Sequence, residues 1–173
     1  MGGWDTGGKG ASIVDVRTDF PHGTTDYRVA ADHYHHVEED VALFGELGLK
    51  AYRFSIQWTR IVPDGDGAVN AAGVAFYHRL IDGLLAQGIE PVVTMYHFDL
   101  PQALAERDGW GHRATIDAFA RYAETLFAEY GSKVTYWLTV NEQNMMVLYG
   151  QMLDILDGPL NRGVSAYQKN HHM

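Results

Sequence analysis

Residues 71–97, AAGVAFYHRLIDGLLAQGIEPVVTMYH, carry the pattern of a helix, a glycine and a strand in direct succession. Apolar side chains recur at helical spacing in the first part, at Val74, Tyr77, Ile81 and Leu84. Asn70 is suited to cap the start of this helix, and Gly88 can end it because glycine readily takes a left-handed conformation. Residues 89–97 are rich in β-branched side chains and predict a strand.

The same unit occurs once before and once after this stretch. The two further units are helix 36–47 with Gly48 and strand 50–56, and helix 113–130 with Gly131 and strand 134–140. Their apolar faces comprise Val37, Val41, Phe44 and Leu47, and Ile116, Phe119, Ala123, Leu126, Phe127 and Tyr130. The three glycines lie 40 and 43 residues apart, which is the size of one helix–strand unit with its loops. Alternating helices and strands predict an α/β fold with parallel strands and right-handed crossovers.

Polar side chains follow each predicted strand. They are Arg53, Ser55 and Gln57 after the first strand, His97 and Asp99 after the second, and Asn141 and Glu142 after the third. The loops that follow strands, 57–70 and 98–112, are also longer than those that follow helices. Because the carboxyl ends of parallel strands share one edge, we expect a functional site there, as in (β/α)8 barrels and open doubly wound sheets.

The Asn141–Glu142 pair has the chemistry of a glycosidase site. A carboxylic acid can act as general acid/base, and a neighbouring amide can hold a sugar hydroxyl. Taken alone, Glu142 also fits a solvated loop carboxylate, and His97 fits a buried histidine that follows an apolar strand.

Composition excludes several other classes of protein. The chain has 173 residues, 46% of them hydrophobic and 20% charged, which is enough for one core. It contains no apolar run of membrane-spanning length and no signal-peptide pattern, so we expect a cytoplasmic protein. The absence of cysteine removes disulfides and thiolate metal sites, and a net charge of −9 argues against nucleic acid or an anionic membrane as partner. The opening MGGWDTGGKG lacks the Walker ending and a preceding strand, so it does not predict a phosphate loop.

Histidines at positions 33, 35 and 36 raise the question of a metal site, because imidazole is a common ligand. The cluster lies at the start of a predicted helix and lacks a carboxylate or cysteine partner at ligand spacing. We therefore expect no metal and no cofactor. Trp58 and Trp137 are expected to be core or pocket-wall aromatics.

Four segments together resemble glycoside hydrolase family 1, the β-glucosidase and 6-phospho-β-glycosidase family. They are GGWDTGGKGASIVDV, DHYHHVEEDVALFGELGLKAYRFSIQWTRI, FYHRLIDGLLAQGIEPVVTMYHFDLPQAL and YWLTVNEQN. The resemblance implies a (β/α)8 barrel whose members cleave β-glycosidic bonds with retention of configuration. It implies that Glu142 is the acid/base, that Asn141 and His97 hold sugar hydroxyls, and that Arg53 orients the nucleophilic carboxylate.

Other parts of the family pattern have no counterpart here. The pattern begins with a strand ahead of residue 1 that carries a sugar-binding glutamine, and its nucleophile is a glutamate on the seventh strand. After Glu142 the carboxylates are Asp154 and Asp157, neither in a matching motif, so no nucleophile is assigned in this chain. We expect residues 1–173 to be a single incomplete barrel domain with about strands two to four, inactive alone. We expect it to self-associate through its open sheet edges.

Two departures bear on the substrate. Gln143 follows Glu142 where many members have proline, and Phe98 follows His97 where many have tryptophan. At both positions the chain resembles the 6-phospho-β-glycosidase branch of the family. Plain β-glucosides and 6-phosphorylated β-glucosides therefore both stay open as substrates. A third possibility is a non-catalytic fragment that serves as a sugar-binding or association module.

Overall fold

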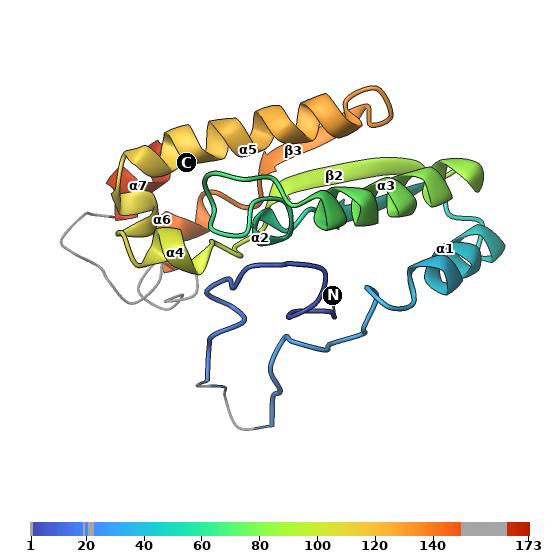
Figure 1. The fold of residues 1–173 in the computed structure, drawn as a ribbon, viewed down its shortest axis with the longest axis horizontal. Coiled ribbons are helices and arrows are strands. Elements are labelled where there is room, and N and C mark those ends of the chain that lie inside the picture. The colour runs from blue at the N-terminus through green and yellow to red at the C-terminus, as the bar shows by residue number, and fades with distance from the viewer. Residues whose placement is uncertain (1, 19, 21–22, 150–165) are drawn as a thin grey trace.

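The computed structural model describes residues 2–18, 20, 23–149 and 166–173, and its centre is a three-stranded parallel sheet (Figure 1). The strands are β1 (Ala51–Ser55), β2 (Glu90–Tyr96) and β3 (Tyr136–Val140), in that order. The long helices are α1 (Val37–Glu46), α3 (Ala71–Ala86) and α5 (Ala114–Tyr130). Helix α3 connects β1 to β2 and α5 connects β2 to β3, so the predicted alternation and the parallel sheet are confirmed.

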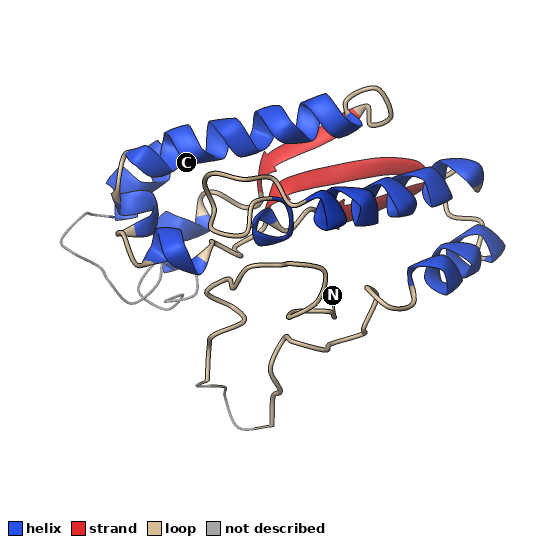
Figure 2. Ribbon diagram, in the orientation of Figure 1, coloured by secondary structure: helices blue, strands red, loops and turns tan. Residues whose placement is uncertain are grey.

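Short helices occupy the connections that follow the strands. They are α2 (Trp58–Ile61), α4 (Gln102–Ala105), the 3-10 helix η1 (Gly109–Gly111), α6 (Met145–Tyr149) and, near the carboxyl terminus, α7 (Ala166–His172). In Figure 2 these short helices gather at the end of the sheet where the strands finish, at the left of the view. The sequence predicted plain loops at 57–70 and 98–112. Part of each is helical.

Helices α3 and α5 cover one face of the sheet. Phe54 of β1 stacks on Tyr77 of α3 at 6.4 Å between ring centroids. Trp137 of β3 meets Phe127 of α5 edge-on at 5.1 Å. Successive strand residues point to opposite faces, so Arg53 and Tyr136 lie on the other face, and both are exposed.

The core continues past the ends of β1 and β2. Trp58 is fully buried, as predicted, and stacks on Tyr122 of α5 at 5.2 Å. The Tyr122 hydroxyl donates to the Ile56 and Met95 carbonyl oxygens, at 2.9 and 3.0 Å. One α5 side chain therefore ties together two adjacent strand ends, and this contact fixes the edge at which the site forms.

The predicted helix ends are confirmed in part. Asn70 Oδ1 accepts the Ala72 N–H at 3.2 Å, and Gly48 and Gly88 are left-handed, with φ of +73° and +69°. Gly131 is different, because its φ is −62° and the chain continues through a right-handed turn before β3. The prediction of a left-handed glycine there was wrong. Leu47 lies beyond the last residue of α1 and is 76% exposed, so it does not belong to the packed face.

The amino-terminal segment packs along the residues that follow β2. Ser12 and Pro101 form an antiparallel bridge, and the Ile13 N–H donates to the Leu100 carbonyl at 3.0 Å. The fully buried Arg60 of α2 reinforces this segment by donating to Gly3 O at 2.8 Å. Within the described part of the chain, no helix is both long enough and apolar enough to cross a membrane.

Candidate active site

The carboxyl ends of the three strands bring four predicted residues to one edge of the sheet. Arg53 is in β1, His97 follows β2, and Asn141 and Glu142 follow β3. The Asn141 N–H donates to the Tyr96 carbonyl at 2.9 Å, which extends the pairing of β2 with β3 by one residue. The predicted clustering of these side chains is therefore present in the fold.

Arg53 connects all three strands through its side chain. Its Nε donates to Thr94 Oγ1 of β2 at 3.0 Å, and its Nη2 donates to Asn141 Oδ1 at 2.5 Å. A hydrogen bond from a charged donor is stronger than a neutral one, so these contacts fix the guanidinium plane. They also orient the Asn141 amide, because its oxygen is the atom that faces the arginine.

His97 is open to solvent on one side only, and the pKa of its imidazole is lowered. Partial burial is the main cause, the positive charge of Arg53 lowers the pKa further, and the negative charge of Glu142 opposes both effects. All three groups thus lie within electrostatic reach of one another. A lowered pKa keeps the imidazole neutral near pH 7, so one ring nitrogen donates a hydrogen bond and the other accepts one.

Asn141 and Glu142 are neighbours in the chain with contrasting environments. Asn141 is 6% exposed, whereas the Glu142 side chain is open to solvent. Glu142 also has a left-handed backbone with φ of +42°, which is uncommon for a residue with a Cβ and is found often at functional sites. Its carbonyl accepts the Met145 N–H at 2.8 Å, so the chain turns sharply here into α6.

A second left-handed residue, Phe98 with φ of +66°, follows His97. The next residue, Asp99, is 8% exposed, so it lies beneath the edge rather than on it as the sequence predicted. Burial raises the pKa of Asp99 to about 6, opposed by backbone N–H groups of Asp99 and His97 and by the charge of Lys9. Its Oδ1 has no hydrogen-bond partner among the described residues.

The sequence did not identify the groups that surround Asp99. Lys9 forms a short ion pair with the buried Asp15, which also accepts the Ser12 N–H at 2.8 Å and the Ser12 hydroxyl at 2.7 Å. This cluster comes from a segment more than 80 residues before Asp99. No local sequence signal indicates that the two segments meet.

Ser55 and Gln57 contribute to the framework at the end of β1. Ser55 is half-buried and pairs with Thr94 in the sheet register. The Gln57 N–H donates to the Tyr77 hydroxyl at 2.8 Å, immediately before α2. We assign neither side chain a role in chemistry.

The three histidines of the predicted cluster each form a hydrogen bond with a different carboxylate. The pairs are His33 with Asp40 at 2.5 Å, His35 with Asp32 at 2.7 Å, and His36 with Glu39 at 3.1 Å. Asp32 precedes α1, whereas Glu39 and Asp40 lie in the first turn of that helix, so each imidazole meets one carboxylate of its own. Among the described residues, no group of three or more possible ligands is arranged to hold a metal.

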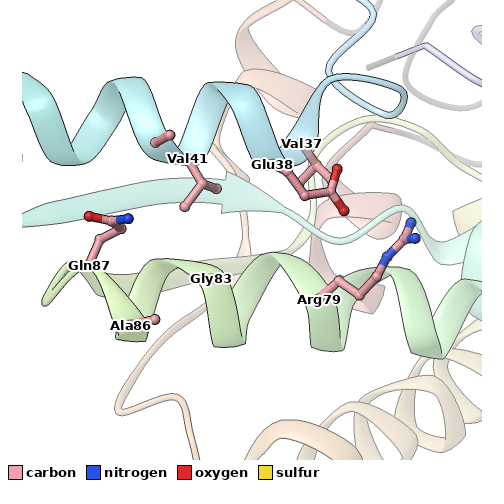
Figure 3. A pocket seen from close by; sticks show the side chains of 8 residues that line it. Val37, Glu38, Val41, Arg79, Gly83, Ala86 and Gln87 are labelled. Carbon is pink, nitrogen blue, oxygen red and sulfur yellow. The ribbon is translucent and has the colours of Figure 1, made fainter.

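A pocket of about 220 Å³ lies between α1 and α3 (Figure 3). It is lined by Val37, Glu38, Val41, Ala42, Arg79, Gly83, Ala86 and Gln87. The predicted site residues are absent from this lining, so the pocket is separate from the site at the strand ends.

The described fold is an α/β protein with a carboxylate, an amide, an imidazole and a guanidinium at the carboxyl ends of parallel strands. Residues 1–173 match the model of Glycosyl hydrolase family 1. The chain belongs to this family, as its motifs predicted.

Relatives of known sequence agree with this assignment. The chain is 47% identical over 174 residues to Aryl-phospho-beta-D-glucosidase BglC of Bacillus subtilis (strain 168), with 98% of this chain and 36% of the relative covered. It is 45% identical over 178 residues to Beta-glucosidase 42 of Arabidopsis thaliana, with 99% and 36% covered.

Solved structures show the same fold. The rice Os3BGlu6 β-glucosidase superposes with a TM-score of 0.88 at 40% identity, over 99% of this chain and 39% of that chain. The family 1 β-glucosidase of Thermotoga maritima, in complex with galacto-hydroximolactam, gives a TM-score of 0.86 at 38% identity, with 99% and 40% covered. The helix–strand units are thus part of a (β/α)8 barrel, as predicted.

The chain spans 36% of each of these two relatives by sequence and 39–40% of the two solved chains. The assignment of β1, β2 and β3 to the second, third and fourth barrel strands stays a prediction.

Proposed function

We propose that the whole protein carrying these residues hydrolyses β-glycosidic bonds, with Glu142 as general acid/base. The observation that carries the proposal is the position of Glu142. It lies exposed at the end of β3, beside an asparagine that Arg53 orients and within electrostatic reach of His97. The family membership of the chain supports the same reaction class.

In the proposed mechanism, Glu142 supplies and recovers one proton. A second carboxylate, which we assign to no residue of this chain, attacks the anomeric carbon while the bond to the leaving oxygen breaks. Glu142 gives its proton to that oxygen. A water then gives a proton to Glu142, and its oxygen displaces the enzyme carboxylate from the sugar. The two carboxyl groups of such a retaining pair lie roughly 5–5.5 Å apart.

Arg53, Asn141 and His97 complete the proposed site. Arg53 orients the second carboxylate through N–H groups beside those bound to Thr94 and Asn141. Because Asn141 Oδ1 already accepts from Arg53, its amide NH2 group is the part available to donate to a sugar hydroxyl. The neutral His97 ring can then bind a neighbouring hydroxyl.

Two substrate classes fit this site. Plain β-glucosides are the first, in line with the β-glucosidase names of several relatives. Glucosides phosphorylated at the 6-position are the second. The observation in their favour is the relative named as an aryl-phospho-β-D-glucosidase, together with Phe98 and Gln143 beside the site.

The test is to assay the whole protein with p-nitrophenyl β-glucoside and with its 6-phosphate. We expect hydrolysis of one of them, with the β-anomer as the first sugar product seen by proton NMR. A folded protein that cleaves neither would refute the proposal. Binding of a sugar-shaped inhibitor such as galacto-hydroximolactam without turnover would favour the sugar-binding module instead.

A further inference from the structure

Thr94 occupies the centre of the sheet, directly below the proposed site. It is 0% exposed, and its register partners are Ser55 on β1 and Leu138 on β3. Its backbone carbonyl accepts the Ile56 N–H at 3.0 Å, and its Oγ1 accepts Arg53 Nε at the same distance. A valine has the same shape as threonine and would fill this space equally well. What threonine provides beyond packing is therefore the hydrogen bond to Arg53.

The two hydrogen bonds of Arg53 define its position together. Thr94 binds Nε, next to the aliphatic stem, and Asn141 binds Nη2 at the tip. With the tip bond alone, the planar guanidinium could still rotate about that contact. A second bond at Nε removes this freedom, because the donors are fixed in one rigid fork. Threonine suits the task, since its branched Cβ restricts the hydroxyl to few rotamers.

We propose that Thr94 is a positioning residue that fixes the Arg53 guanidinium and, through it, the Asn141 amide. The inference rests on the proposed function, because Arg53 and Asn141 are assigned there to the nucleophile and to the sugar. Thr94 itself touches neither. Its hydroxyl determines where Arg53 places the N–H groups that face the second carboxylate.

The substitution Thr94→Val removes the acceptor and keeps the shape. A hydrogen bond to a charged group contributes about 1.5–3 kcal/mol, so we expect kcat to fall by about 10–150-fold if that energy is used in the transition state. KM should change less, because Arg53 acts on the attacking carboxylate. Thr94→Ser keeps the hydroxyl, and its kcat should recover to within a few-fold of wild type.

The experiment compares these variants in the whole protein by kcat, KM and thermal melting. Thr59→Val is the matched control, because Thr59 is equally buried and its Oγ1 has no hydrogen-bond partner among the described residues. Its kcat should stay near wild type. If the valine variant does not fold, Thr94→Ser and Thr94→Cys are compared in its place, because these two variants differ only in having oxygen or sulfur at the γ position.

A double-mutant cycle with Arg53→Lys separates positioning from packing. Lysine has no Nε–H to bind the threonine hydroxyl, so Thr94→Val should cause little further loss of kcat in that background. Three results would each overturn the proposal. The first is an equal loss of kcat on Thr94→Val in the wild-type and Arg53→Lys backgrounds, and the second is an equal loss for Thr94→Val and Thr94→Ser. The third is a wild-type kcat for Thr94→Val.

A measurement that does not need activity distinguishes this inference from the proposed function. The Arg53 Nε–H signal in a 15N NMR spectrum of the whole protein should exchange slowly with water in wild type and Thr94→Ser. It should exchange fast in Thr94→Val. An inactive wild type refutes the proposed function, whereas an Nε–H signal that is the same in all three proteins refutes the positioning by Thr94.

Discussion

Arg53 Nη2 and Asn141 Oδ1 lie 2.5 Å apart, although 88 residues separate them in sequence. The contact joins the exposed face of β1 to the first residue after β3, across the strand between them. This hydrogen bond holds Asn141 in place, so the backbone directly before the proposed acid/base Glu142 is rigid. Substitutions at Glu142 should therefore report on its chemistry more than on the fold.

The substitution Glu142→Gln in the whole protein removes the transferable proton and keeps the size of the side chain. General acid/base catalysis contributes typically about 10²–10⁴ in rate, so hydrolysis should fall by that factor for a substrate with a poor leaving group. The first, glycosylation step with an activated aryl glycoside should fall much less, because that leaving group departs without protonation. Burst and steady-state kinetics with both substrates check this, and full activity on both would show that Glu142 is not the acid.

Asp99→Asn should make stability less dependent on pH. The pKa of Asp99 rises from 3.8 to about 6 on folding because the carboxyl is buried. The folded state therefore binds more protons between these two values, so the free energy of unfolding falls as pH rises through this window. Asparagine does not titrate, so the variant lacks this loss. The change in the free energy of unfolding caused by Asp99→Asn should therefore be about 2–3 kcal/mol more favourable at pH 8 than at pH 3.

Thermal melts of the whole protein from pH 3 to pH 8 measure this gain. Lys9 and Asp15 are the charged groups that act on Asp99 from the amino-terminal segment, and both stay unchanged in the variant. Asp5→Asn, at an exposed position, is the control and should follow the wild-type pH dependence. Parallel curves for wild type and Asp99→Asn would contradict the assigned burial.

Replacing Gly73 or Gly83 of α3 by alanine should change the free energy of unfolding in opposite directions. A Cβ on Gly73 would lie 1.9 Å from the Arg60 carbonyl oxygen, so Gly73→Ala should destabilise the fold by about 1–3 kcal/mol through overpacking. A Cβ on Gly83 would meet Val41 at 3.4 Å, an ordinary contact. Gly83→Ala should therefore stabilise by up to about 1 kcal/mol, because alanine favours helix. Urea unfolding of both variants measures the difference, and equal midpoints would contradict the close contact at Gly73.

The 173-residue polypeptide made alone should not hydrolyse β-glycosides at a measurable rate. Among the described residues, Glu142 is the one carboxylate at the strand ends to which we assign a catalytic role, and Asp99 is buried below it. Without a nucleophile, one difficult displacement cannot be divided into two easier steps. The check is an assay with p-nitrophenyl β-glucoside and its 6-phosphate beside a Glu142→Ala control. Turnover above that control would identify Asp99 as the next residue to replace.

The sequence predicted features that depend on local patterns. Helical spacing located α1, α3 and α5, and the cap at Asn70 follows from residue type alone. The gathering of Arg53, His97, Asn141 and Glu142 followed from the parallel order of the strands. Their catalytic roles stay predictions, as does the association of the chain through its open sheet edges.

What the sequence did not predict depends on contacts between distant segments. The left-handed residues Phe98 and Glu142 have side chains that do not favour this conformation, so only the surrounding fold specifies it. The burial of Asp99 follows from a segment far away in the chain. The hydroxyl of Thr94 gave no signal, because threonine is common in strands whether or not its side chain accepts a hydrogen bond.

The bridge between Ser12 and Pro101 has a consequence for the order of events during synthesis. Ile13 is made 87 residues before its partner Leu100. At about 5–20 residues per second, this delay lasts several seconds. During that time the glycine-rich amino-terminal segment lacks the backbone partners it has in the fold, and chaperones and proteases have access to it. The rate of translation between these positions should therefore influence how much protein reaches the folded state.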